Sequence, residues 1–190
     1  MTGSWPAAAG AADAALFDET LVCEAVLPAA FAPGPGHGQP LQAEALLRGL
    51  AQVEDLRGED GGEEKRGELP ALAQRMDAKL DLVLALLGRL VRQSAPVLPA
   101  LPLRWSARGL RLTLPADPGL AAGTGGVVRL QPSEWLPDAL ELPATVSASA
   151  AVDGQFLLWL RFGLLPAALE DALERHLFRM HRREVAARRR

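Results

Sequence analysis

The side chains of this sequence best suited to catalysis or metal binding are three histidines and one cysteine. His37 lies in a Pro/Gly-rich stretch, and no base can be identified that would activate Cys23. His176 and His181 are five positions apart on a predicted helix, whereas two metal ligands on one helical face are four apart. We therefore expect no catalytic residue, no metal ligand and no enzyme activity. The histidines are interpreted as surface or packing residues, and Cys23 as a small buried apolar residue.

Two short runs share features with ligand-binding loops. Residues 123–126, Gly-Thr-Gly-Gly, lack the Lys-Ser/Thr end of a phosphate-binding loop and lead into a strand instead of a helix. We interpret them as a hairpin turn. The acidic run at residues 59–64 does not follow the order of a calcium loop, so we interpret it as a solvated charged loop.

Arginines gather at the C-terminal end of the sequence. Such a cluster is able to contact nucleic acid or anionic lipid, but positive charge is also favoured at a helix C-terminus, and Phe178 is the single aromatic residue beside it. We favour the second interpretation and keep a nucleic-acid or anionic-membrane binder as the alternative function. The cluster consists of Arg175, Arg179, Arg182, Arg183, Arg188, Arg189 and Arg190.

Composition restricts the class of protein. The 190 residues, 49% of them apolar, suffice for one compact domain or for a small domain with an added segment. The formal charge of −3 gives no overall attraction to nucleic acid. No apolar run reaches the roughly 18 residues of a membrane-spanning helix, and no secretion signal is recognised. With a single cysteine, the chain suits a reducing compartment, and we expect it to be cytoplasmic.

Three regions follow from the patterns along the chain. Residues 1–39 are rich in Ala, Gly and Pro and are expected to hold only short packed elements. Residues 40–95 are predicted to be a helical segment that begins at Pro40. Residues 96–190 show alternating strand patterns, a hairpin signal at Asp153-Gly154, and a final helix from Pro166. This third region is predicted to be a small antiparallel barrel or sandwich.

Apolar residues in the second half of the helical segment recur at spacings of three and four, as in a heptad seam. Leucine at the a positions argues against a two-stranded coiled coil. The pattern alone favours equally a bundle of several chains and packing against the barrel and the first helix. The residues proposed for self-association are Leu69, Met76, Leu80, Val83, Leu87 and Leu90.

Several stretches together resemble the PilZ family, in particular its atypical branch with a long helix before the barrel. They are Arg-Met-Asp-Ala-Lys-Leu-Asp-Leu-Val-Leu-Ala-Leu-Leu at residues 75–87, Leu-Arg-Trp-Ser-Ala-Arg-Gly-Leu-Arg-Leu at 103–112, and Leu-Arg-Phe at 160–162, followed by a helix with His-Leu-Phe-Arg-Met-His-Arg-Arg at 176–183. The resemblance covers residues from about 68 to 183. It implies an α+β fold: a six-stranded antiparallel β-barrel with a preceding long helical segment and a C-terminal helix.

Typical PilZ domains bind cyclic di-GMP through Arg-x-x-x-Arg and Asp/Asn-x-Ser-x-x-Gly motifs. Ser106 and Gly109 match the second motif, but Arg104 occupies the Asp/Asn position, and arginine cannot accept a hydrogen bond. Two arginines four apart are missing between residues 90 and 104. The resemblance therefore implies a degenerate site at Arg104, Ser106, Arg108 and Gly109, with the usual binding weak or lost.

The resemblance also implies a function. We expect a PilZ-type adaptor or receptor in bacterial cyclic di-GMP signalling, for motility, pili or surface behaviour, which acts by protein–protein contact. Family members with the long helix associate through it, some as parallel four-stranded bundles, which favours a homo-oligomer such as a tetramer. A signalling, pilus or motility protein is the further expected partner. No cofactor is expected, and cyclic di-GMP is the candidate ligand.

Overall fold

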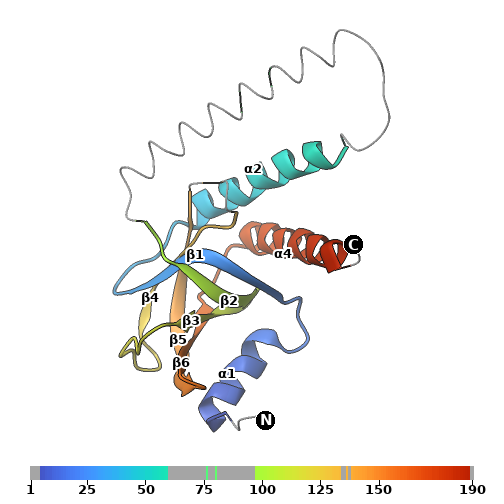
Figure 1. Cartoon of the computed structure of the whole chain (residues 1–190). Helices are drawn as coiled ribbons and strands as arrows, with labels where there is room; N and C mark the ends of the chain where they lie inside the picture. The colour runs from blue at the N-terminus through green and yellow to red at the C-terminus, as the bar shows by residue number, and fades with distance from the viewer. Residues whose placement is uncertain are drawn as a thin grey trace.

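The computed structural model describes residues 5–59, 76, 80, 97–133, 136 and 138–188. Within them, six antiparallel strands close into a barrel in the order β1-β2-β3-β6-β5-β4, with helices around it (Figure 1). The predicted fold class is confirmed. The strands are Cys23–Pro33 (β1), Ala100–Ser106 (β2), Gly109–Leu114 (β3), Gly125–Leu130 (β4), Leu140–Val152 (β5) and Gln155–Phe162 (β6), and the helices are Ala7–Phe17 (α1), Pro40–Glu59 (α2) and Ala167–Arg188 (α4).

Strand β1 closes the barrel by pairing with two different strands along its length. Its residues 23–28 pair with β2, and its residues 29–33 pair with β4. Pro28 has no backbone N–H to donate, and it lies where β1 leaves β2 for β4. The prediction that residues 96–190 form the barrel by themselves is therefore wrong. Strand β1 of the barrel comes from the N-terminal segment at residues 1–39, whose Ala/Pro-rich composition argues against a strand.

The Gly-rich run at residues 123–126 contains the end of the connection from β3 and the first two residues of β4, and these two strands are not neighbours. Strand β3 pairs with β2 and β6, whereas β4 pairs with β1 and β5. The backbone N–H of Gly123 donates to the carbonyl of Val146 at 2.8 Å, and the N–H of Val146 donates to the carbonyl of Thr124 at 2.9 Å. The run thus pairs with β5, and the hairpin turn predicted here is wrong because a hairpin joins adjacent strands.

The predicted hairpin at Asp153-Gly154 is confirmed between β5 and β6. Val152 pairs with Gln155, so the loop contains two residues. Asp153 and Gly154 have φ angles of 50° and 78°, and two positive φ angles are the requirement of the type I′ turn that joins twisted strands.

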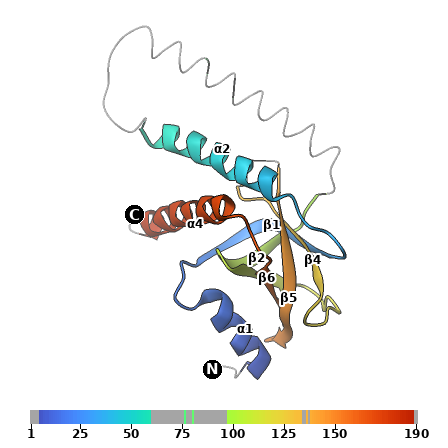
Figure 2. The ribbon, with the colours of Figure 1, turned by 180° about the vertical axis from the view of Figure 1, so that it is seen from behind.

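One apolar core fills the barrel and continues under two helices. Inward-facing residues such as Leu112 and Leu142 are fully buried, and Leu47 of α2 packs into the same cluster. The predicted final helix is α4, and the residues buried along it include Leu169 and Leu173. Figure 2 shows α2 and α4 side by side against the barrel. The two helices therefore belong to the same folded unit as the strands.

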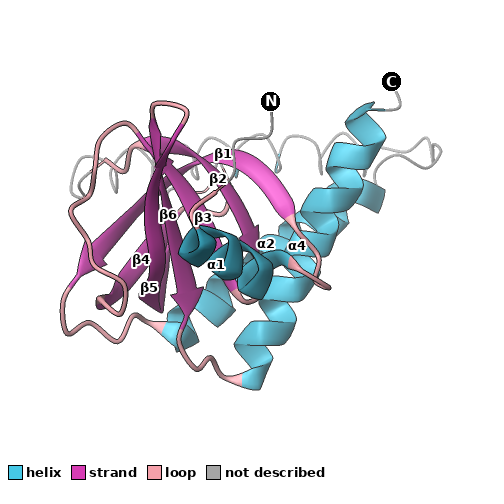
Figure 3. Ribbon diagram, turned by 90° about the horizontal axis from the view of Figure 1, so that it is seen from below, coloured by secondary structure: helices cyan, strands magenta, loops and turns pink. Residues whose placement is uncertain are grey.

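Helix α1 lies across the outer surface of the barrel (Figure 3). It contributes Leu16 and Phe17 to a second apolar cluster, which also contains Leu157 and Trp159 of β6. The alternate residues of β6, Leu158 and Leu160, belong to the core inside the barrel. Because α1 covers its other face, β6 is buried on both faces. A strand covered on both faces is apolar at nearly every position, as β6 is.

Candidate functional site

The β2–β3 hairpin brings together the four residues of the predicted degenerate motif. Ser106 pairs with Gly109, and Ala107 and Arg108 form the turn between them. Leu103 and Trp105 belong to the core inside the barrel. Because side chains alternate along a strand, Arg104 and Ser106 lie on the outer face, which α1 covers.

Ser106 is fully buried under the end of α1. Its hydroxyl donates to the carbonyl of Leu16 at 2.7 Å and accepts from the backbone N–H of Arg108 at 3.1 Å. The second contact is the local side-chain turn that Ser commonly forms with the residue two positions on. Ser106 therefore stabilises the hairpin turn and holds the helix at the same time.

Gly109 is required because two other segments approach its Cα. A Cβ atom at this position would overlap the carbonyl oxygen of Leu160 and lie 2.9 Å from Cδ2 of Leu16. The motif glycine thus lets both β6 and α1 pack closely on the hairpin.

A single carboxylate on α1 accepts three hydrogen bonds from the barrel. Oδ1 of Asp13 accepts from Nη1 of Arg111 at 2.9 Å and from Nε1 of Trp159 at 2.8 Å, while Oδ2 accepts from Nη1 of Arg104 at 3.3 Å. The side chains of Asp13, Arg104 and Arg111 are 18%, 30% and 17% exposed. Such partly desolvated, charge-assisted bonds are stronger than neutral ones. We call Asp13, Arg104, Arg111 and Trp159 the Asp13 cluster.

Arg104 contacts α1 through its flat face as well. The guanidinium carbon lies 4.7 Å from the centre of the Phe17 ring, a cation–π distance. The carboxylate of Glu24 is 4.0 Å away, but its side chain is 71% exposed, so this pair contributes little. The guanidinium that occupies the motif's Asp/Asn position is therefore engaged mainly by α1.

Arg108 binds the C-terminal end of α1. Its Nη1 donates to the carbonyl of Asp18 at 2.9 Å and lies 3.4 Å from the carbonyl of Ala15. The last carbonyls of a helix have no partner within the helix and carry partial negative charge. A cation is well matched to this end of α1.

Three residues of this site were not among the predicted ones: Asp13, Arg111 and Trp159. Asp13 is the single acidic residue among residues 1–17, in a run of alanines. A lone charge in an apolar helix is a signal that could have marked it, because such a charge needs a partner when the helix packs. Its partners were not predictable, since they lie about a hundred or more residues away.

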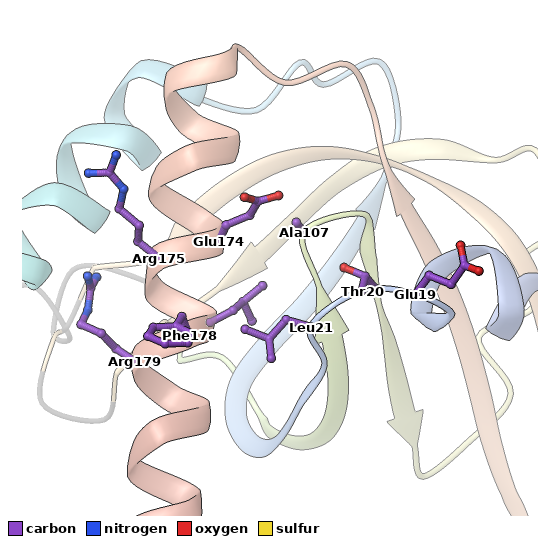
Figure 4. A pocket seen from close by; sticks show the side chains of 9 residues that line it. Glu19, Thr20, Leu21, Ala107, Glu174, Arg175, Phe178 and Arg179 are labelled. Atoms are coloured by element: carbon purple, nitrogen blue, oxygen red, sulfur yellow. The ribbon is translucent and has the colours of Figure 1, made fainter.

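A hollow of about 600 Å³ lies next to the motif hairpin, between the loop after α1 and helix α4 (Figure 4). Its wall combines Ala107 of the hairpin with Phe178, Arg175 and Glu174 of α4. Phe178 is 54% exposed. The volume lies in the range of small-molecule sites, but its lining brings carboxylates and guanidinium groups together and is not selective for one charge.

Two of the residues weighed for catalysis, His176 and Cys23, are buried, whereas His37 is exposed. Burial lowers the pKa of His176 to about 4; Arg179 and Arg183 add to this effect and the Pro132 backbone opposes it. Burial and Glu184 raise the pKa of Cys23 to about 11, against a lowering by the His181 backbone. The Cys23 thiol donates to the carbonyl of Leu177 at 3.2 Å. No cluster suited to a metal ion occurs among the described residues.

Most described arginines of the C-terminal cluster have partners within the chain. Nε of Arg179 lies 3.0 Å from Glu54, and Nη2 of Arg183 lies 2.8 Å from the same carboxylate. Arg175 and Arg188 pair with acidic residues one turn earlier on α4. No helix in the described part of the chain has the length and hydropathy of a membrane span. The alternative function gains no support from these contacts.

Two residues of the predicted seam, Met76 and Leu80, are described. Both are helical, and they are 58% and 57% exposed. The other four, Leu69, Val83, Leu87 and Leu90, lie outside the described residues.

The comparisons with known proteins agree with this architecture. A family model described as an atypical PilZ domain, cyclic di-GMP receptor (tPilZ), matches residues 47–190. The chain belongs to the atypical PilZ family, as its sequence motifs predict. This is a family of receptors.

The solved structure of a pathogenic protein from Xanthomonas campestris shares 55% sequence identity with this chain. The match covers 96% of this chain and 99% of the Xanthomonas chain, with a TM-score of 0.79. The Xanthomonas protein is described as a new tetrameric PilZ domain self-assembled via an unusual helical bundle. The Bacillus subtilis inhibitor of motility MotI/DgrA is 18% identical over 46% of this chain and 43% of its own, with a TM-score of 0.38, too low to carry an argument. None of the curated proteins matches this chain.

Proposed function

We propose that this protein is a PilZ-type adaptor in bacterial cyclic di-GMP signalling, which acts by protein–protein contact and binds the nucleotide weakly or not at all in the usual mode. One observation carries the proposal: the polar side chains of the motif hairpin are already engaged by α1. Ser106 donates to Leu16, Arg108 to Asp18, and Arg104 to Asp13. A nucleotide at this surface would have to compete with the chain's own helix.

The chemistry of the motif supports the same conclusion. Recognition of a guanine N–H group at the Asp/Asn position needs an acceptor, and Arg104 has only donors. The paired arginines that would grip the phosphates are missing from residues 90–104. Both changes remove favourable contacts with the nucleotide, and neither affects the barrel core.

We further propose that the chain self-associates through the predicted seam, as a tetramer. Met76 and Leu80 are helical apolar residues that the rest of the described chain leaves more than half exposed. Burial of such side chains is worth about 1.5–3 kcal/mol each. The likeness to the tetrameric Xanthomonas protein supports a helical bundle here too. Signalling output to motility, pili or surface behaviour would then pass through barrels displayed on this bundle.

The first test is calorimetric titration with cyclic di-GMP, with the mass measured by light scattering in the same buffer. We expect no measurable heat and the mass of an oligomer. Tight binding by the unmodified protein would contradict the proposed loss of the usual mode. A monomeric mass would contradict self-association.

The second test changes the seam. Leu80→Asp together with Leu87→Asp should give a monomer, because charges would be buried between the helices. The matched control is Leu41→Asp, at a position on α2 that is 79% exposed and outside the seam; it should leave the mass unchanged. An oligomeric, folded double variant would rule out the proposed interface.

A further inference from the structure

Helix α1 depends on the barrel for its stability. It has 11 residues, and no side chain caps its N-terminus. Isolated helices of this length are marginal in water. Its buried apolar residues are two alanines with Leu16 and Phe17. Besides these apolar contacts, the helix is held by the hydrogen bonds to Leu16 and Asp18 at its C-terminal end and by those of Asp13.

Beneath α1, three side chains lie next to one another across adjacent strands. Arg104 of β2 pairs with Arg111 of β3, and Arg111 pairs with Trp159 of β6. Arg108 extends from the turn of the same hairpin. In the folded chain, the carboxylate of Asp13 pairs with the guanidinium groups of Arg104 and Arg111, as a bound anion would. Without α1, the barrel would present three guanidinium groups beside an indole ring.

We propose that α1 is an internal occupant of this surface, and that its release opens a site for a phosphodiester ligand. Guanidinium groups bind phosphate through paired, charge-assisted hydrogen bonds, and an indole provides a stacking face for a base. Asp13 and a phosphate compete for the same donors, Arg104 and Arg111. The inference rests on the proposed function, in which the closed chain does not bind the nucleotide, and it adds how the surface becomes available.

When α1 covers the surface, the ligand can bind only to the fraction of molecules in which α1 is released. The apparent affinity is the intrinsic affinity multiplied by this fraction. Asp13→Asn keeps the size of the side chain and removes its charge, so it weakens the hold on both arginines. Asp13→Lys places a third cation beside Arg104 and Arg111 and repels them. Both variants should increase the open fraction, and Asp13→Lys more so. We expect cyclic di-GMP to bind at least about tenfold more tightly to Asp13→Lys than to the unmodified chain.

The experiment uses the full chain and two measurements. Hydrogen exchange over residues 7–17 reports whether α1 is released, and calorimetry with cyclic di-GMP reports binding. The matched control is Asp18→Asn, which removes a carboxylate from an exposed position next to α1. Asp18 contacts Arg108 through its backbone carbonyl, which this substitution keeps. This control should exchange and bind as the unmodified chain does. Arg111→Ala added to Asp13→Lys should abolish the gained binding while α1 stays released.

Two outcomes would overturn the inference. One is rapid exchange of α1 in Asp13→Lys without any gain in binding, because an open surface would then have no affinity for the phosphodiester. The other is unchanged protection of α1 in both Asp13 variants, because the carboxylate would then not hold the helix. Neither outcome affects the proposed function, which fails instead if the unmodified chain binds tightly or is monomeric.

Discussion

The carboxylate of Asp13 accepts a hydrogen bond from the indole Nε1 of Trp159 at 2.8 Å, although the two residues are 146 positions apart. Trp159 is fully buried, and its ring also packs edge-on against Trp5, with the centroids 5.5 Å apart. The same carboxylate binds two arginines of the motif hairpin. One acidic residue therefore ties the N-terminal helix to three strands of the barrel.

Removal of this carboxylate should destabilise the fold. Asp13→Ala leaves Arg104, Arg111 and the Trp159 N–H without their acceptor, and polar groups deprived of partners at a partly buried site cost about 1–3 kcal/mol. We expect the free energy of unfolding to fall by that amount in urea titrations. Asp18→Ala is the control and should change it by less than about 0.5 kcal/mol. Equal losses in the two variants would show that the cluster has no special role.

The close packing at Gly109 predicts a contrast between two glycines. Gly109→Ala should destabilise the protein by about 3 kcal/mol, because its methyl group would overlap the Leu160 carbonyl and press on Leu16. Gly10→Ala, in α1, meets no atom within 4 Å and should stabilise the protein by about 0.5–1 kcal/mol through helix propensity. Thermal unfolding of both variants measures the difference. A neutral Gly109→Ala would contradict the close approach.

Glu54 joins α2 to α4, so its loss should loosen the helix pair. Its side chain is 12% exposed and binds both Arg179 and Arg183. Glu54→Ala should lower the free energy of unfolding by about 2 kcal/mol, since it leaves a largely buried guanidinium unpaired. Faster hydrogen exchange in α2 should accompany this loss.

Glu44→Ala provides the control for Glu54→Ala on the same helix. Glu44 pairs with Arg48, whose side chain is 63% exposed, and pairs of this kind contribute about 0.5 kcal/mol or less. If both substitutions gave the same small loss, the contact between α2 and α4 would not depend on Glu54.

The buried His176 should make stability depend on pH. Folding lowers its pKa to about 4, so the unfolded chain binds this proton more readily than the folded one does. Stability should be unaffected by His176 above about pH 6.5 and should fall by about 3 kcal/mol as the pH drops to about 4. Urea titrations at a series of pH values measure this slope.

His176→Phe separates this effect from carboxylate protonation, which also weakens the fold in acid. Phe keeps an aromatic ring against Trp105, whose ring lies edge-on at 5.7 Å from that of His176. Between pH 4 and 6.5 the variant should lose less stability than the unmodified protein. Parallel curves for the two proteins would show that His176 is not the source.

Patterns within a few residues account for the parts of the fold that were predicted correctly. The alternation in β3 reports which face of this strand is buried, and the Asp-Gly pair at residues 153–154 marks the tight turn between β5 and β6. The motif residues Arg104, Ser106, Arg108 and Gly109 were singled out by the family resemblance, and the structure adds that β2, β3 and the turn between them form one hairpin.

The errors share one cause, which is pairing between distant segments. Strand β1 is Ala/Pro-rich, and it is a strand because β2 and β4 each offer it free backbone groups along half its length. The glycine run 123–126 looks like a hairpin turn, but β3 has β2 and β6 as neighbours and leaves no edge for β4. Closure of a barrel depends on all six strands at once and has no local signature.

By itself, the sequence determined local features such as the alternating strand patterns, the Asp153-Gly154 hairpin and the final helix, because these depend on neighbouring residues only. The barrel and the altered motif followed from its resemblance to the atypical PilZ family. Only the tertiary structure showed that helix α1 and the residue after it contact the side chains of that motif. Asp13 reaches Arg104, Arg111 and Trp159 because β1 carries the N-terminal segment onto the barrel and strand register aligns those three side chains. Such a contact depends on the positions of four elements at once, and no spacing in the sequence records it.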